Sequence, residues 1–170
     1  VPAVDPNVEA PQFSFRMSAI DHVAAPGGSV KIVDAHRFPA TTISAALVEV
    51  EPGGMREIHW HPNSDEWQYY LEGSARMTVF ATSNIARTFD YEAGDVVYVP
   101  KAMAHYIENT GDTPMRFLAL FRSPHYANVS LTQWLALTPP GLVKAHLNLS
   151  DEVIASFSKA QLTVVTGTKP

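Results

Sequence analysis

Short stretches in which apolar and polar residues alternate fill most of the chain from residue 13 to residue 122. The clearest is Ile-Ser-Ala-Ala-Leu-Val-Glu-Val-Glu at 43–51, which ends at Pro52 and Gly53. Alternation with period two places successive side chains on opposite faces of a β-strand. Many short strands separated by turn residues predict an all-β sandwich or barrel, whose interior holds side chains and one small ligand. The other stretches predicted as strands are 13–17, 29–38, 66–72, 74–80, 87–91, 95–99, 105–109 and 115–122.

Residues beyond 130 follow a helical period instead. We expect helices over 131–137, 140–146 and 151–159, the last with Ser150 as its N-cap residue. The first helix carries an apolar stripe that either packs against the barrel or forms a subunit interface. The chain after Leu162 shows no such period, and we expect it to be frayed. The stripe consists of Leu131, Trp134, Leu135 and Leu137.

Composition limits the classes of protein that this chain can belong to. With 170 residues, 46% of them apolar, the chain is long enough for one domain with a substantial core. Its net charge is −5 and it has no basic run, so nothing favours nucleic acid as a partner. No apolar run approaches the roughly 18 residues that a membrane span needs. Cysteine is absent, which excludes disulfides and thiolate ligands.

The candidate chemistry centres on two histidines that are one residue apart. His59 and His61 share one face of a strand, whereas Trp60 faces the other way. Glu66 follows a turn-rich break, so we expect it to return on the neighbouring strand of a hairpin. His105 lies on a later strand. A lone histidine on an apolar strand is more often a core residue, but three imidazoles with one carboxylate are typical of a divalent transition-metal site.

The spacing of these residues is specific. The first stretch reads G-x5-H-x-H-x4-E-x6-G from Gly53 to Gly73, and the second reads G-x5-P-x-A-x2-H-x3-N from Gly94 to Asn109. Together they resemble the two signature motifs of the cupin superfamily. The one departure is Ala102, which stands where the family pattern usually has glycine. The resemblance implies a single cupin domain, a double-stranded β-helix or jelly-roll barrel, here with C-terminal helices.

A closer resemblance extends over about residues 13–159. The runs at 55–81, 86–121 and 126–150 look like the C-terminal half of bicupin oxalate decarboxylases. These enzymes bind manganese in each cupin domain through three histidines and one glutamate. The resemblance therefore implies Mn²⁺, with Fe²⁺ as the alternative, bound by His59, His61, Glu66 and His105.

The same resemblance suggests residues for catalysis. A pocket arginine of the family, three residues before the first ligand histidine, matches Arg56. Strict alternation from His59 would turn Arg56 to the opposite face, so its role requires a bulge in the strand. The family's pocket glutamate is replaced by Ala119, and the segment 124–128, which matches a lid that carries a catalytic glutamate, has no carboxylate. His125 could replace the missing acid or be an exposed loop residue.

The sequence pattern and the resemblance together divide the chain into parts. We expect an extended arm over 1–12, a cupin barrel over 13–123, a lid segment with the C-terminal helices over 124–160, and a tail over 161–170. The helices favour a homo-oligomer. Secretion is slightly favoured, because Asn128 and Asn148 begin short glycosylation sequons and because relatives of this kind are often secreted.

The function that follows is a metal-dependent enzyme for a small organic acid. Oxalate is the acid to which the resemblance points, with formate release in a decarboxylase and peroxide release from O2 in an oxidase. Because the two glutamates are absent, two alternatives stay open. One is a cupin enzyme with different chemistry, namely a dioxygenase, an isomerase or a decarboxylase of another acid. The other is a cupin that binds metal without catalysis.

Overall fold

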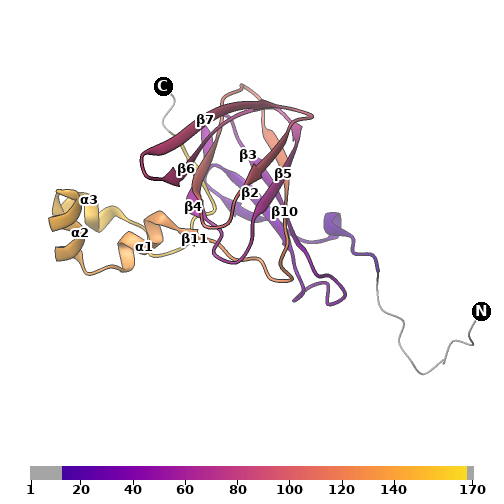
Figure 1. Cartoon of the computed structure of the whole chain (residues 1–170), viewed down its shortest axis with the longest axis horizontal. Coiled ribbons are helices and arrows are strands. Elements are labelled where there is room, and N and C mark those ends of the chain that lie inside the picture. The colour runs from indigo at the N-terminus through magenta and orange to yellow at the C-terminus, as the bar shows by residue number, and fades with distance from the viewer. Residues whose placement is uncertain (1–12, 168–170) are drawn as a thin grey trace, which may run out of the picture.

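Two antiparallel β-sheets lie face to face in the computed structural model, which describes residues 13–167 (Figure 1). The first sheet contains, in spatial order, β1 (Val23–Ala25), β2 (Gly28–Val33), β3 (Ser44–Val50), β10 (Met115–Phe121), β5 (Glu66–Glu72) and β8 (Val96–Val99). The second contains β11 (Val129–Ser130), β4 (Gly54–Trp60), β9 (Ala104–Asn109), β6 (Ser74–Thr82) and β7 (Ile85–Glu92), and β12 (Val164–Thr166) also pairs with β4. The prediction of an all-β cupin jelly roll is confirmed.

Period-two burial builds the core, as the alternating sequence predicts. In β3 and β10 every second residue is buried, and the buried positions carry mainly apolar side chains. Val48, Tyr70, Met77 and Phe117 meet in the interior between the sheets. Burying a large apolar side chain contributes about 1.5–3 kcal/mol, so this interior supplies the rigid frame on which the polar residues are held.

The predicted first strand over 13–17 is wrong. A short 3₁₀ helix begins at Met17 instead, and Phe15 packs against Phe38 with ring centroids 5.8 Å apart. The strand predicted for 29–38 also ends early, at Val33. A turn forms there, because the carbonyl of Asp34 accepts hydrogen bonds from the backbone N–H groups of residues 37 and 38.

The expected hairpin that would carry the metal ligands is also wrong. β4 and β5 follow each other in sequence but belong to opposite sheets, since β4 pairs with β9 while β5 pairs with β10 and β8. Local alternation does not reveal this, because the pairing strands lie far away in the sequence. His59 and Glu66 therefore approach each other across the interior of the sandwich and not along one ladder.

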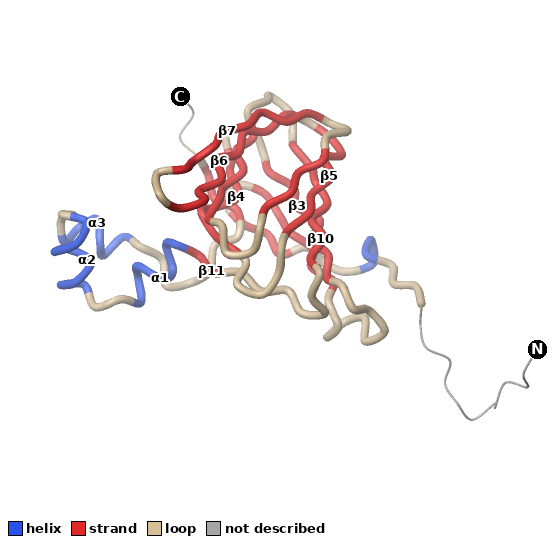
Figure 2. Tube along the Cα trace, viewed as in Figure 1, coloured by secondary structure: helices blue, strands red, loops and turns tan. Residues whose placement is uncertain are grey.

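Three short helices extend to one side of the barrel (Figure 2). They are α1 (Leu131–Leu137), α2 (Pro140–Leu147) and α3 (Asp151–Ser156), the last shorter than expected at its C-terminal end. Ser150 caps α3 as predicted, because its side chain accepts a hydrogen bond from Val153 N–H at 3.3 Å. None of the described helices has the length and apolar character needed to cross a membrane.

The apolar stripe of α1 is half exposed: Leu131 and Leu135 are partly buried, whereas Trp134 and Leu137 are exposed. Trp134 contacts Trp60 of β4 edge-on, with ring centroids 6.0 Å apart, but 57% of Trp134 and 63% of Leu137 stay accessible. No residue of α1 is fully buried, so packing against the barrel accounts for only part of the stripe. The subunit interface stays a prediction.

The C-terminal segment is ordered, contrary to expectation. β12 pairs with β4 at Met55 and Arg56, and Val164 is fully buried in the core. The prediction that the chain frays after Leu162 is therefore wrong for residues 164–166. The segment is ordered because it pairs with β4, a strand that lies far away in the sequence. The predicted arm over 1–12 lies outside the described residues.

Candidate metal centre

Four buried side chains converge in the interior between the two sheets. His59 lies in β4, His61 follows the end of that strand, Glu66 begins β5 and His105 lies in β9. Each offers one ligand atom, and these atoms all lie within 4.8 Å of one another. Every one of the four residues is at most 3% exposed. The structure thus brings together the four residues that the sequence spacing singles out.

A backbone carbonyl fixes the ring of each of the three histidines. In each pair the ring Nδ1 lies within hydrogen-bonding distance of a carbonyl oxygen, and a carbonyl only accepts. Each Nδ1 therefore carries the proton, and each Nε2 presents a lone pair, as in histidines that bind a metal through Nε2. The pairs are His59 with the carbonyl of Glu57 at 2.7 Å, His61 with that of Ala127 at 2.7 Å and His105 with that of Met103 at 3.0 Å.

The remaining ligand atoms face one another without a donor between them. Glu66 Oε2 lies 2.9 Å from His105 Nε2 and 3.3 Å from His61 Nε2. Because the protons are on Nδ1, each of these contacts brings two lone pairs together. Within the described residues, none of the three buried atoms has a hydrogen-bond partner. A cation among them would convert this repulsion into ligation, so the residues fit a divalent metal.

The charge states of the cluster suit a metal. Burial, followed by the positive charge of Arg56, lowers the pKa of His59 well below its usual value, so this imidazole stays neutral. Burial works to raise the pKa of Glu66, but the two neighbouring imidazoles of His105 and His61 outweigh it and hold the pKa well below the usual range. Gln68 Nε2 donates to Glu66 Oε1 at 2.9 Å and orients the carboxylate.

A glycine-like turn supports His61. Ala102 has φ 63°, in the left-handed region that favours glycine, and its N–H donates to the carbonyl of His61 at 3.0 Å. Ala102 stands where the cupin pattern usually has glycine, and it adopts the left-handed conformation that glycine favours.

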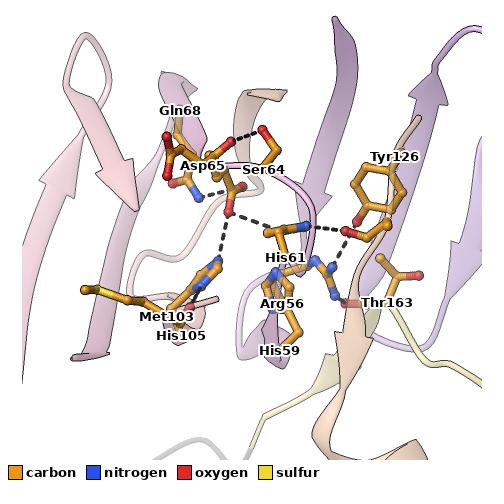
Figure 3. A network of polar contacts seen from close by, with 12 residues as sticks. Arg56, His59, His61, Ser64, Asp65, Gln68, Met103, His105, Tyr126 and Thr163 are labelled. Carbon is orange, nitrogen blue, oxygen red and sulfur yellow. Dashed lines mark hydrogen bonds and ion pairs between the residues drawn. The ribbon is translucent and has the colours of Figure 1, made fainter. Parts of the chain in front are cut away.

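Arg56 lies beside this cluster, as the family resemblance implied. The register of β4 against β9 shifts between Arg56 and His59, which is the bulge that the prediction required. Its guanidinium donates through Nη1 to the carbonyl of Thr163 at 2.7 Å and through Nη2 to Tyr126 Oη at 3.1 Å. Figure 3 shows these contacts next to His61. The C-terminal segment before β12 therefore holds Arg56 in place.

Glu57 is a buried carboxylate that the sequence did not single out. The bulge turns it inward beside Arg56, with 3.8 Å between Glu57 Oε1 and Arg56 Nη1. Ser130 Oγ donates to Glu57 Oε2 at 2.6 Å. Burial raises the pKa of Glu57, while the hydrogen bond from Ser130 and the charge of Arg56 oppose the rise. Strand parity could not have found this residue, because the bulge breaks it.

The segment predicted as a lid lies against the cluster through Tyr126. The ring centroid of Tyr126 is 5.7 Å from that of His61 and 5.2 Å from that of Phe121. Burial raises the pKa of Tyr126, and the charge of Arg56 opposes the rise. His125 is exposed and its ring lies against His36, with 4.7 Å between centroids. Ala119 is buried in the core and adds no polar group.

Comparisons with known proteins identify a family and several similar proteins. The family model described as cupin matches residues 17–155. The oxalate decarboxylase OxdC of Bacillus subtilis is 53% identical over 162 residues, which are 94% of this chain and 42% of OxdC. The probable oxalate decarboxylase of Arthroderma benhamiae is 42% identical over 158 residues, or 91% of this chain and 39% of the relative.

A solved structure of the Bacillus subtilis oxalate decarboxylase, studied for its Mn(II) centres, superimposes with a TM-score of 0.93 at 51% identity. The match covers 98% of this chain and 45% of that one. The chain thus spans less than half the length of each of these oxalate decarboxylases.

Proposed function

This chain belongs to the cupin family, and on that premise we propose that it is a metal-dependent enzyme acting on oxalate or a similar small carboxylate. The observation that supports the proposal best is the convergence of His61 Nε2, His105 Nε2 and Glu66 Oε2, three buried acceptors to which no group within residues 13–167 donates a hydrogen bond. A purely structural core would not leave such a set uncompensated.

We propose Mn²⁺ as the resident ion. A site of three neutral imidazoles and one carboxylate suits Mn²⁺ and Fe²⁺, and ligand type does not separate the two. Manganese is favoured because the similar Bacillus subtilis enzyme has Mn(II) centres. When bound, the ion would supply Lewis-acid polarisation and a template for the substrate.

Arg56 would recognise the substrate carboxylate. Its contacts to Thr163 and Tyr126 use one N–H on each terminal nitrogen, and a guanidinium has five donors. The remaining donors can form charge-assisted hydrogen bonds with a carboxylate, which are about twice as strong as neutral ones. Because the guanidinium is already held by its other contacts, little side-chain entropy is lost when the substrate binds.

Release of formate requires a proton at the carbon that loses CO2, and two residues near the cluster are candidates for its delivery. Tyr126 is protonated at neutral pH and borders both Arg56 and His61. His125, the replacement predicted from the sequence, contacts His36 at the surface, so delivery from it would require the lid segment to move.

The second candidate function is an oxidase or another cupin reaction on a different acid. This candidate is favoured by Ala119. Its buried methyl group has neither the charge nor the bulk of the glutamate that stands at this position in the family. An oxidase would release CO2 and peroxide with O2 as the second substrate, and would need no proton at carbon.

Carbon-13 NMR of manganese-loaded protein with labelled oxalate in air tests these functions. Formate indicates the decarboxylase, whereas labelled CO2 with peroxide and without formate indicates the oxidase. No turnover by protein that holds its metal would contradict the proposed oxalate activity and direct a screen to other acids. Protein carrying His59→Ala serves as the control for reaction by free metal.

A homo-oligomer remains our prediction for the assembly. The outer face of β5 and β8 exposes Trp67, Tyr69, Val96 and Tyr98, each at 39% or more. Apolar groups gathered in this way are typical of an interaction surface. Light scattering on the purified chain would give its mass, and a monomer at all concentrations would contradict the prediction.

A further inference from the structure

A second group of potential metal ligands lies at the surface, outside the site described above. Asp34, His36 and His125 each offer one ligand atom, and these atoms all lie within 4.8 Å of one another. We propose that the three residues form a separate transition-metal site that joins the turn after β2 to the lid segment. This inference does not depend on the proposed oxalate chemistry.

Backbone contacts bring the two segments together. The N–H of Ala35 donates to the carbonyl of Pro124 at 2.7 Å. Asp34 Oδ2 accepts from the N–H of Tyr126 at 3.3 Å, and Asp34 Oδ1 accepts from the N–H of His36 at 3.0 Å. The carboxylate thus contacts both of the segments that carry the two histidines.

The lid segment is fixed from its other side as well. Asn63 Nδ2 donates to the carbonyl of His125 at 2.8 Å, and Ser123 Oγ accepts from the N–H of His125 at 3.3 Å. These contacts use the backbone of His125 and leave its imidazole available. The rings of His36 and His125 lie 4.7 Å apart between centroids, tilted by 37°.

Two imidazoles and one carboxylate make a donor set for Zn²⁺, Ni²⁺ or Cu²⁺. Each oxygen of Asp34 accepts one hydrogen bond and has a second lone pair free for a metal. His36 and His125 are exposed, so ligation costs little desolvation, and water can complete the coordination. We take Zn²⁺ as the probe because it binds such sets with tetrahedral geometry.

The location of the site gives it a consequence for the lid. His125 immediately precedes Tyr126, whose hydroxyl accepts from Arg56 and whose ring borders His61. An ion shared by His36 and His125 ties this segment to the turn after β2. Zinc therefore holds Tyr126 in place above the buried cluster and slows opening of the segment.

Equilibrium dialysis against Zn²⁺, followed by elemental analysis, tests the proposal. The wild-type chain should bind about two ions, because the buried cluster also accepts zinc. His36→Ala should bind one, with affinity for the lost ion reduced by more than about tenfold. His22→Ala, which removes another exposed histidine, should still bind two. His36 is exposed, and its side chain can be removed without disturbing the core.

The outcomes separate this proposal from the proposed metal centre. Equal zinc binding by wild type and His36→Ala would overturn the surface site. A single ion in wild type that His36→Ala abolishes would support the surface site and contradict the buried centre. Amide exchange gives an independent measurement: zinc should slow exchange of the backbone amides of residues 125–128 in wild type and not in His36→Ala. Exchange unaffected by bound zinc would overturn the clamping role.

Discussion

The two histidine clusters of this chain differ in how they are held. In the buried cluster, a backbone carbonyl fixes the Nδ1 of His59, His61 and His105. Among the described residues, no hydrogen bond fixes the ring of His36 or His125 at the surface. Before any ion binds, the fold therefore fixes the tautomer and orientation of the three buried imidazoles and excludes water from them. At the surface it only brings the side chains of the second cluster close together. Metal binding should couple to stability at the first and to loop motion at the second.

Removing a buried ligand should have the largest effect. His59→Ala or Glu66→Ala should lower the metal content from about one manganese per chain to none, measured by elemental analysis after dialysis. Chelation should lower the melting temperature of wild type, since an ion at about 100 times its Kd stabilises the fold by about 2.7 kcal/mol. His146→Ala, an exposed control, should keep its metal. Normal manganese in both ligand variants would show that the metal lies elsewhere.

Arg56→Ala should have the next largest effect, on substrate and not on metal. Loss of a charge-assisted contact costs about 1.5–3 kcal/mol, so kcat/KM on oxalate should fall about 10- to 100-fold while manganese content stays near wild type. Arg76→Ala removes an exposed arginine that pairs with Asp90 at 2.8 Å and is the matched control. If the two variants had equal kcat/KM, Arg56 would have no role in substrate recognition.

Much of the buried site could be predicted because its geometry follows from local rules. Strand parity places His59 and His61 on one face, and the bulge that the structure contains was required once the family resemblance assigned a pocket role to Arg56. Gln68 could have been found in the same way, since it shares its parity with Glu66 in β5 and lies on the same face. Residues on one strand are thus accessible to sequence reasoning.

The parts that sequence reasoning missed depend on pairing between distant segments. Glu66 faces the histidines from the opposite sheet, and β4 supplies the edge on which residues 164–166 pair as β12 beside Arg56. Glu57 is buried by the bulge and by Ser130, which no local period reveals. The surface cluster likewise depends on a contact between residues 35 and 124.

Gln68→Leu should show how much the contacts around a ligand matter at the buried site. The change removes the donor to Glu66 Oε1 and the acceptor of Tyr70 Oη, which lies 3.2 Å away. Loss of such an orienting contact typically weakens metal binding by about 10- to 100-fold, so manganese affinity should fall in this range. Gln133→Leu, which breaks an exposed contact to the carbonyl of Lys159, is the control. Unchanged affinity would mean that Glu66 is oriented by the other ligands alone.

The smallest effect is expected at the surface cluster, where zinc should act only through the lid. In zinc-free buffer, turnover of manganese-loaded His36→Ala should stay near that of wild type, because His36 belongs to the surface cluster and is not one of the four buried ligands. Added zinc should slow wild type by restraining Tyr126 and leave His36→Ala unaffected. His125→Ala distinguishes a role in zinc binding from a role in catalysis. If turnover in zinc-free buffer fell by about 100-fold or more in His125→Ala but not in His36→Ala, proton delivery would be assigned to His125. Equal inhibition of wild type and His36→Ala by zinc would instead locate the inhibitory ion in the buried site.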